Sequence, residues 1–72
     1  MEAFIQRFRG VVREFDKSRG YGTIEDESGK RIFVRYSAII GQGIRTLKSG
    51  DRVSFHLEDT QRGPNAVHVM LD

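Results

Sequence analysis

The sequence predicts an all-β protein, a small barrel of five short strands, and three observations lead to that prediction. Apolar and polar residues alternate with a period of two over several segments, which is the pattern of half-buried strands. Polar turns, most of them containing glycine, separate these segments at short intervals. The pattern fits within about 65 residues, and a barrel hides the strand edges that an open sheet would leave unpaired.

The first half of the chain contains three strand candidates. In residues 11–15, Val11, Arg13 and Phe15 alternate with Val12 and Glu14, and a polar cluster follows. Residues 21–24 are β-prone and interrupted by glycine, and residues 25–30 form a polar loop in which Gly29 can take a positive φ. Residues 32–36 are the strongest candidate because they combine β-branched and aromatic side chains.

The second half of the chain contains two more strand candidates. Glycines within residues 37–50 argue against a long helix there, and we expect at most a single turn at 37–39. Residues 53–58 alternate, residues 61–65 have the composition of a turn, and residues 66–71 form the last strand. At this size a five-stranded OB-type barrel is the natural architecture, and an SH3-like barrel is the competing one.

Composition places the chain among small globular domains. Its 72 residues, 38% hydrophobic and 31% charged, allow one domain over residues 1–72, in which residues 1–9 form an N-terminal extension or lengthen the first strand. The absence of cysteine excludes disulfides and thiolate chemistry. No window reaches the ~20 apolar residues of a membrane span. We therefore expect a cytoplasmic protein with no membrane partner.

No motif in the sequence predicts catalysis. His56 and His68 are the only imidazoles, and a two-histidine metal site is much rarer than solitary surface histidines. Gly-x-Gly occurs at residues 20–22 and 41–43, but neither copy completes a nucleotide-binding fingerprint. We predict a protein that is not an enzyme and that uses no metal or cofactor.

Aromatic and arginine side chains are interleaved in two strand candidates, although the net charge is only +2. Residues 19–24 and 32–36 show this pattern, and Arg13 and Phe15 precede them. Aromatic rings stack unpaired bases and guanidinium groups hold phosphates, which is how sequence-tolerant single-strand binders work. Composition alone leaves an alternative open. In that alternative the rings fill the core of a barrel and the arginines only keep the surface of the barrel solvated.

These segments resemble the cold-shock domain family. The stretch Gly-Val-Val-Arg-Glu-Phe-Asp at 10–16 resembles its first strand, and Arg-Gly-Tyr-Gly-Thr-Ile at 19–24 resembles its RNP1 motif. Ile-Phe-Val-Arg-Tyr-Ser-Ala-Ile at 32–39 resembles the RNP2 motif, and further similarities lie at 43–47, 50–55 and 62–66. The resemblance covers residues 10–69 and implies a five-stranded antiparallel OB-fold barrel that binds single-stranded RNA or DNA.

The resemblance also implies a binding face, formed by Arg13, Phe15, Arg19, Tyr21, Phe33, Arg35, Tyr36 and Arg62. Glu14, Thr23 and Ile44 stand where the family has aromatic residues, and Arg35 stands where it has histidine. Fewer stacking rings predict weaker binding, and the arginines predict a steeper salt dependence. We also expect Glu14 to pair with Arg35 or Arg13 on the sheet surface.

Two hypotheses about function follow. The first is a monomeric single-strand binder of the cold-shock type that acts as a stoichiometric RNA chaperone, because similar proteins hold RNA unpaired without ATP. The second is a protein-interaction module that keeps the barrel and has lost most of its affinity for nucleic acid. The second hypothesis draws on Glu14, Thr23 and Ile44 and on the apolar segment at residues 4–8.

Overall fold

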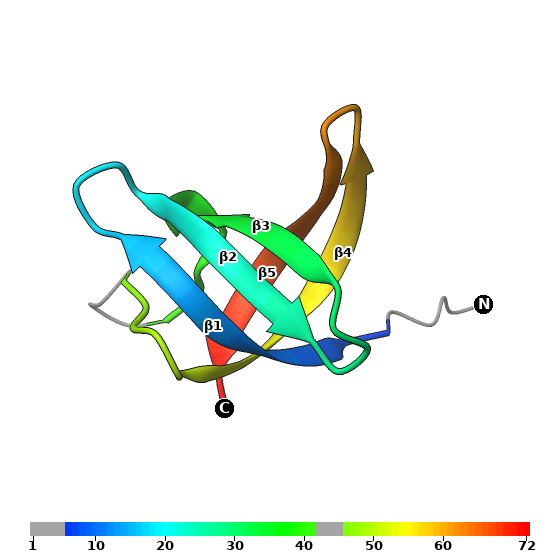
Figure 1. The fold of residues 1–72 in the computed structure, drawn as a ribbon, viewed down its shortest axis with the longest axis horizontal. Helices are drawn as coiled ribbons and strands as arrows, with labels where there is room; N and C mark the ends of the chain where they lie inside the picture. Colours follow the sequence, from blue (N-terminus) through cyan, green and yellow to red (C-terminus); the bar gives the residue numbers. More distant parts are fainter. Residues whose placement is uncertain (1–5, 42–45) are drawn as a thin grey trace.

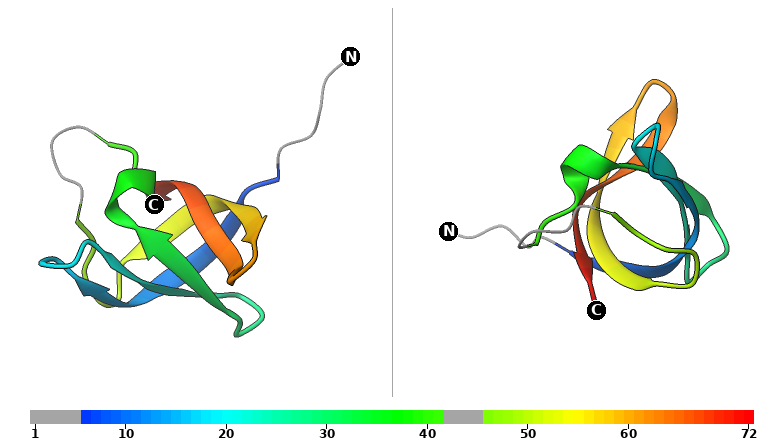
Figure 2. Two further views of the ribbon diagram at one scale, coloured as in Figure 1. Left: turned by 90° about the horizontal axis from the view of Figure 1, so that it is seen from above. Right: turned by 90° about the vertical axis from the view of Figure 1, so that its left-hand side faces the viewer.

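The computed structural model describes residues 6–41 and 46–72, and they form a closed barrel of five strands (Figure 1). The order around the barrel is β1-β2-β3-β5-β4, and β4 pairs with β1 to close it (Figure 2). The elements are β1 Phe8–Asp16, β2 Tyr21–Asp26, β3 Arg31–Arg35, the 3₁₀ turn η1 Tyr36–Ala38, β4 Arg52–Thr60 and β5 Gly63–Leu71. The predicted five-stranded barrel is confirmed.

The barrel is antiparallel, as predicted, in four of its five strand pairings, and the fifth pairing is parallel. Strands β3 and β5 run parallel, with Phe33 opposite Asn65 and Val34 opposite Ala66, while the other four pairings are antiparallel. Strand directions cannot alternate all the way around a ring with an odd number of strands, so one neighbouring pair must run in the same direction. The β3–β5 seam is that pair.

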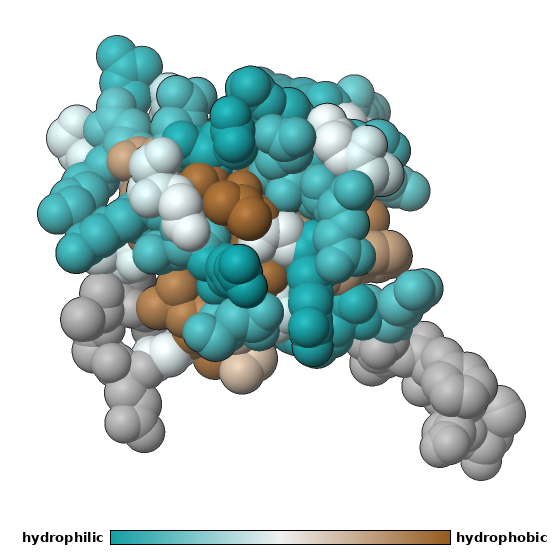
Figure 3. All heavy atoms as spheres, turned by 60° about the horizontal axis from the view of Figure 1, so that its bottom comes forward, coloured by the Kyte–Doolittle hydropathy of each residue, from teal (hydrophilic) through white to brown (hydrophobic). Residues whose placement is uncertain are grey.

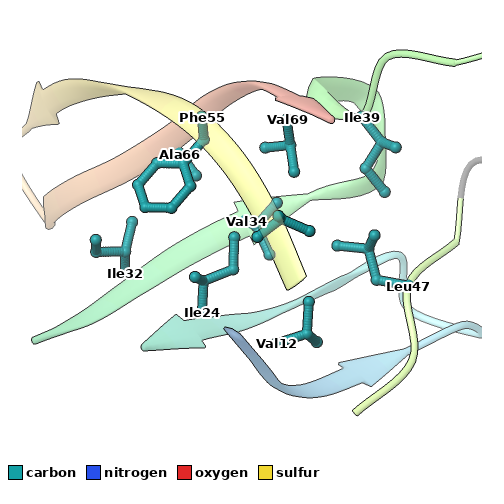
Figure 4. Packing of buried hydrophobic residues seen from close by; sticks show 10 residues of the cluster. Val12, Ile24, Ile32, Val34, Ile39, Leu47, Phe55, Ala66 and Val69 are labelled. Atoms are coloured by element: carbon teal, nitrogen blue, oxygen red, sulfur yellow. The ribbon is translucent and has the colours of Figure 1, made fainter. Parts of the chain in front are cut away.

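The core contains apolar side chains from all five strands and from the connection after β3 (Figure 4). Successive side chains of a strand point to opposite faces, so the alternation seen in the sequence sends one set inward. Ten hydrophobic residues are buried, and no polar or charged residue in the described parts of the chain is buried with them. The buried set is Val12, Ile24, Ile32, Val34, Ile39, Leu47, Val53, Phe55, Ala66 and Val69.

Several element boundaries differ from the prediction. Strand β1 begins at Phe8, and β5 begins at Gly63, inside the segment predicted as a turn. Gly63 pairs with Thr60, and Pro64 pairs with Asp59, so the two strands extend almost to the tip of their hairpin. Tyr36 belongs to η1 and not to β3. Residues 1–5 lie outside the described residues, so the role proposed for residues 1–9 stays a prediction.

A bulge in β1 sets the orientation of two charged side chains. Val12 pairs with Ile24 and Glu14 with Thr23, so Arg13 is an extra residue on β1. Because a bulge places two residues opposite one, Arg13 and Glu14 are both exposed on the outside of the barrel. The next pair is Phe15 and Gly22, where a Cβ on Gly22 would lie 2.7 Å from the Phe15 Cα. Glycine at this position lets β1 and β2 approach each other closely.

The outer surface seen in Figure 3 is mainly hydrophilic, with small apolar areas between charged and polar residues. Among the described residues, the exposed large hydrophobic ones are Val11, Tyr36, Ile40, Met70 and Leu71. In the described parts of the chain, no helix has the length and apolar character needed to cross a membrane.

Candidate nucleic-acid interface

The outer face of β1, β2 and β3 holds two rows of paired residues. Thr23 lies between Glu14 on β1 and Phe33 on β3, and Tyr21 lies opposite Arg35. Directly opposite residues of neighbouring strands project to the same side of the sheet, so these side chains share one face. The strands that carry them lie side by side in Figure 1.

Two aromatic rings form the centre of this face. The centroids of Tyr21 and Phe33 lie 5.3 Å apart, and the ring planes are inclined by 34°. Both residues are only partly buried, although they belong to strands whose other side chains fill the core. Rings that are held in place and remain accessible on one side can stack unpaired bases.

Arg19 is held beside these rings by two contacts. Its Nη1 donates a hydrogen bond to the Tyr21 hydroxyl at 3.1 Å, and its Nε lies 3.9 Å from the Asp16 Oδ2. The hydrogen bond to Tyr21 and the nearby acidic groups raise the pKa of Arg19. Gly20, with φ +78°, accepts a hydrogen bond from the Tyr36 backbone N–H at 2.8 Å and so connects this loop to η1.

A hollow of about 450 Å³ extends from this face toward the β4–β5 hairpin. Besides Phe33, Arg35 and Arg62, it is lined by Thr60, Gln61 and Asn65. The neighbouring hollow, of about 500 Å³, lies over the two rings. Six of the eight predicted site residues line this second hollow: Arg19, Tyr21, Phe33, Arg35, Tyr36 and Arg62. The closure of the barrel therefore brings the hairpin residue Arg62 to residues from β2 and β3 that are distant in the sequence.

The two other predicted site residues lie elsewhere. The Nε of Arg13 lies 3.3 Å from the Glu25 Oε1, which places Arg13 in an ion pair across β1 and β2. Phe15 is half-buried against the core and lines a smaller hollow, of about 290 Å³, at the end of the barrel. Neither residue lines the hollow of about 500 Å³ over the two rings, although Phe15 shares another hollow with Tyr21 and Phe33 on the β1 side. The participation of Arg13 and Phe15 in binding stays a prediction.

The expected ion pair of Glu14 with Arg13 or Arg35 is wrong. Arg13 pairs with Glu25 instead, and within residues 6–41 and 46–72 the structure has no ion pair of Glu14. The cause is the strand register, because Arg35 lies opposite Tyr21, two strands away from Glu14 and in the other row. Ile44, the third replaced aromatic position, lies outside the described residues.

The two histidines form a cluster that sequence reasoning missed. The Nδ1 atoms of His56 and His68 lie 3.2 Å apart, and Arg7 Nη1 lies 3.2 Å from His56 Nε2. His68 has φ 51°, at a shift in the β4–β5 register. Reduced hydration, then the charge of Arg7 and then that of His68, lower the pKa of His56. The described residues contain no group of three or more metal-binding side chains.

A family model described as the 'Cold-shock' DNA-binding domain matches residues 8–71. That range covers every strand of the barrel. The chain belongs to the cold-shock domain family. Nucleic-acid binding of the cold-shock type is therefore the function that its family supports, and the protein-interaction alternative is not favoured.

Bacterial members of the cold-shock family are similar over most of the chain. It is 45% identical over 62 residues to the cold shock protein CspB of Bacillus caldolyticus, covering 86% of this chain and 94% of that protein. It is 46% identical over 61 residues to the cold shock-like protein CspE of Bacillus anthracis (85% and 91%). A cold shock-like protein of Thermotoga maritima is 44% identical over 63 residues (88% and 96%).

A solved structure described as drosophila Unr CSD456 has the same fold. Its TM-score is 0.78 and it covers 94% of this chain, whereas this chain spans 27% of that one. The sequence identity is 16%, so this likeness concerns the fold alone. It supports the OB-type barrel over the SH3-like alternative.

Proposed function

We propose that this cold-shock domain binds single-stranded RNA or DNA across the Tyr21–Phe33 face, more weakly and with a steeper salt dependence than typical family members. One observation carries the proposal: the hollow over the two rings is bordered by Arg19, Arg35 and Arg62. Rings that stack bases and guanidinium groups that hold phosphates are the two components of single-strand binding.

The weaker affinity follows from side chains that cannot stack. Glu14 and Thr23 lie in the same row as Phe33, at positions where typical members carry aromatic rings. Each base–ring stack contributes about 1–3 kcal/mol. If the two losses add, two missing stacks reduce the affinity by about 30-fold at the least, because every 1.4 kcal/mol is a factor of ten. The Glu14 carboxylate also repels phosphates.

The salt dependence follows from the arginines. If about 3–4 phosphates are neutralised, log affinity falls against log salt concentration with a slope of about −2 to −3, at ~0.7 per contact. With fewer stacking rings, the electrostatic contribution is a larger share of the total. Binding of this kind is stoichiometric and needs no catalytic step, so the protein holds RNA unpaired only while it is bound.

Oligonucleotide titration at two salt concentrations tests the proposal. The ligands are oligouridine and oligothymidine of about seven nucleotides, within the ~4–16 nucleotides that an OB fold covers. We expect the backbone and side-chain resonances of Tyr21, Phe33 and Arg35 to shift at low salt and to return when salt is raised. The absence of any shift with about 100 μM oligonucleotide, a typical concentration for even non-specific binding, would contradict it.

A further inference from the structure

A third hollow, of about 440 Å³, opens on the β1 side of the ring pair and has two carboxylates in its lining, Glu14 and Asp16. Its other lining residues are Phe15, Tyr21, Gly22, Thr23 and Phe33. The volume falls in the range of about 300–1,000 Å³ that is usual for ligand sites. The hollow therefore combines a surface for a base with acceptor groups at its side.

The two carboxylates differ in what they already bind. Asp16 Oδ1 accepts hydrogen bonds from the backbone N–H groups of Ser18 and Arg19 and from the Ser18 hydroxyl, at 2.8–3.1 Å. These contacts lower the pKa of Asp16 and fix it in the β1–β2 turn. Glu14 is exposed, and the described parts of the chain give its carboxylate no hydrogen bond or ion pair. Glu14 is the carboxylate that can accept hydrogen bonds from a ligand.

Register places Glu14 within reach of a base stacked on Phe33. Glu14, Thr23 and Phe33 lie opposite one another on three consecutive strands. Neighbouring strands are about 4.8 Å apart, so about 10 Å of sheet separates Glu14 from Phe33. The small Thr23 lies between them, which leaves space for a base whose ring covers Phe33 and whose edge points to Glu14.

The chemistry of that edge distinguishes the four bases. Guanine presents two adjacent donors on its Watson–Crick edge, the N1–H and N2–H₂ groups, which match the two oxygens of one carboxylate. Cytosine and adenine each present one amino group there. Uracil and thymine present a single N–H between two carbonyl oxygens, and these oxygens repel a carboxylate.

We propose that Glu14 is a base-reading residue, which favours guanine over uracil and thymine at the nucleotide stacked on Phe33. The proposal rests on the proposed single-strand binding and adds a base preference to it. Thr23 contributes mainly by its small size.

The experiment measures dissociation constants of RNA heptamers by fluorescence anisotropy at low salt. The first ligand is heptauridine. The second set carries one guanosine, placed at each of the seven positions in turn. The third set carries inosine in place of that single guanosine. Inosine keeps N1–H and O6 and lacks only the N2 amino group. We expect guanosine to bind about tenfold more tightly than uridine at one position, which corresponds to about 1.4 kcal/mol. At that position inosine should lose most of the gain.

Two variants isolate the carboxylate. Glu14→Gln removes the charge and one acceptor, so it should tighten the binding of heptauridine and reduce the guanosine-to-inosine ratio below about twofold. Glu27→Gln makes the same change in the β2–β3 loop, outside the hollow, and should leave the ratio unchanged.

The outcomes separate this inference from the proposed function. If heptauridine binds and the guanosine-to-inosine ratio is the same in the wild type and in the Glu14→Gln variant, the base-reading role is wrong and single-strand binding stands. If no heptamer binds at about 100 μM, both are wrong.

Discussion

The Nδ1 atoms of His56 and His68 lie 3.2 Å apart on neighbouring strands of the barrel. The other ring nitrogen of His56, Nε2, lies 3.2 Å from the Nη1 of Arg7. The Nη2 of Arg7 donates hydrogen bonds to the carbonyl oxygens of Ser54 and His68, each at 2.8 Å. Arg7, directly before β1, thereby connects that end of the strand to the β4–β5 hairpin. The charge of Arg7 makes a positive charge on His56 less favourable.

This cluster predicts that the protein loses stability in mild acid. The folded-state pKa of His56 lies below its ordinary value of 6.5, so the unfolded chain binds more protons. The stabilisation is complete above pH 6.5 and is lost as the pH falls through that value toward the lower folded-state pKa. In the described structure His56 contacts Arg7 and His68, and both disfavour its charged form.

Thermal unfolding between pH 7.5 and 5.5 tests this prediction. The melting temperature of the wild type should fall as the pH is lowered, and that of His56→Gln should fall less. Asp16 and Asp26 have pKa values lowered from 3.8, so they titrate below this window and do not obscure it. Parallel curves for the two proteins would show that the histidine pair is not responsible.

The Thr23 hydroxyl predicts a stabilising substitution. Its Oγ1 is buried and has no hydrogen-bond partner in the described structure. An unsatisfied buried hydroxyl costs about 1–3 kcal/mol, and valine has the same shape and a high β propensity. We expect Thr23→Val to raise the free energy of unfolding by about 1 kcal/mol in urea denaturation.

Thr60→Val is the matched control for that experiment. The Thr60 hydroxyl donates to the Gly63 carbonyl at 2.7 Å and accepts from the Arg62 N–H at 3.1 Å. The same substitution there should lower the free energy of unfolding by about 0.5–1.5 kcal/mol, because it removes made hydrogen bonds. A destabilised Thr23→Val variant would mean that the Thr23 hydroxyl is satisfied in solution.

The sequence predicts features that a single continuous segment determines, and it does not predict features that depend on how two strands pair. The alternation around Phe55 and the motifs around Tyr21 and Phe33 are local, and they indicated the barrel and its face. The bulge at Arg13 is a property of two paired strands, and no residue type in the sequence marks it. For the same reason the sequence could not show that Arg13 pairs with Glu25 and not with Glu14. The His56–His68 contact likewise depends on the β4–β5 register.

The salt dependence of binding should change when one arginine of the face is removed. Arg35 lines two of the three hollows that Phe33 borders. Arg35→Gln should weaken oligonucleotide binding several-fold at low salt and make the log–log salt slope shallower by about 0.7, the value for one phosphate contact on a single strand. Arg52→Gln is the control, because Arg52 is an exposed arginine of β4 that lines none of these hollows. Equal slopes for the two variants would exclude Arg35 from phosphate binding.

Restoring the missing rings should restore affinity. Glu14 and Thr23 stand opposite each other beside Phe33, and the hollow they line has room for larger side chains. The double substitution Glu14→Trp with Thr23→Phe adds two stacking surfaces, each worth about 1–3 kcal/mol, and removes a repulsive charge. We expect at least a tenfold gain in affinity for a pyrimidine-rich oligonucleotide, measured by fluorescence anisotropy. The gain should persist at high salt, because stacking is not screened by ions. A smaller gain, or one that disappears in salt, would mean that these two positions do not contact bases.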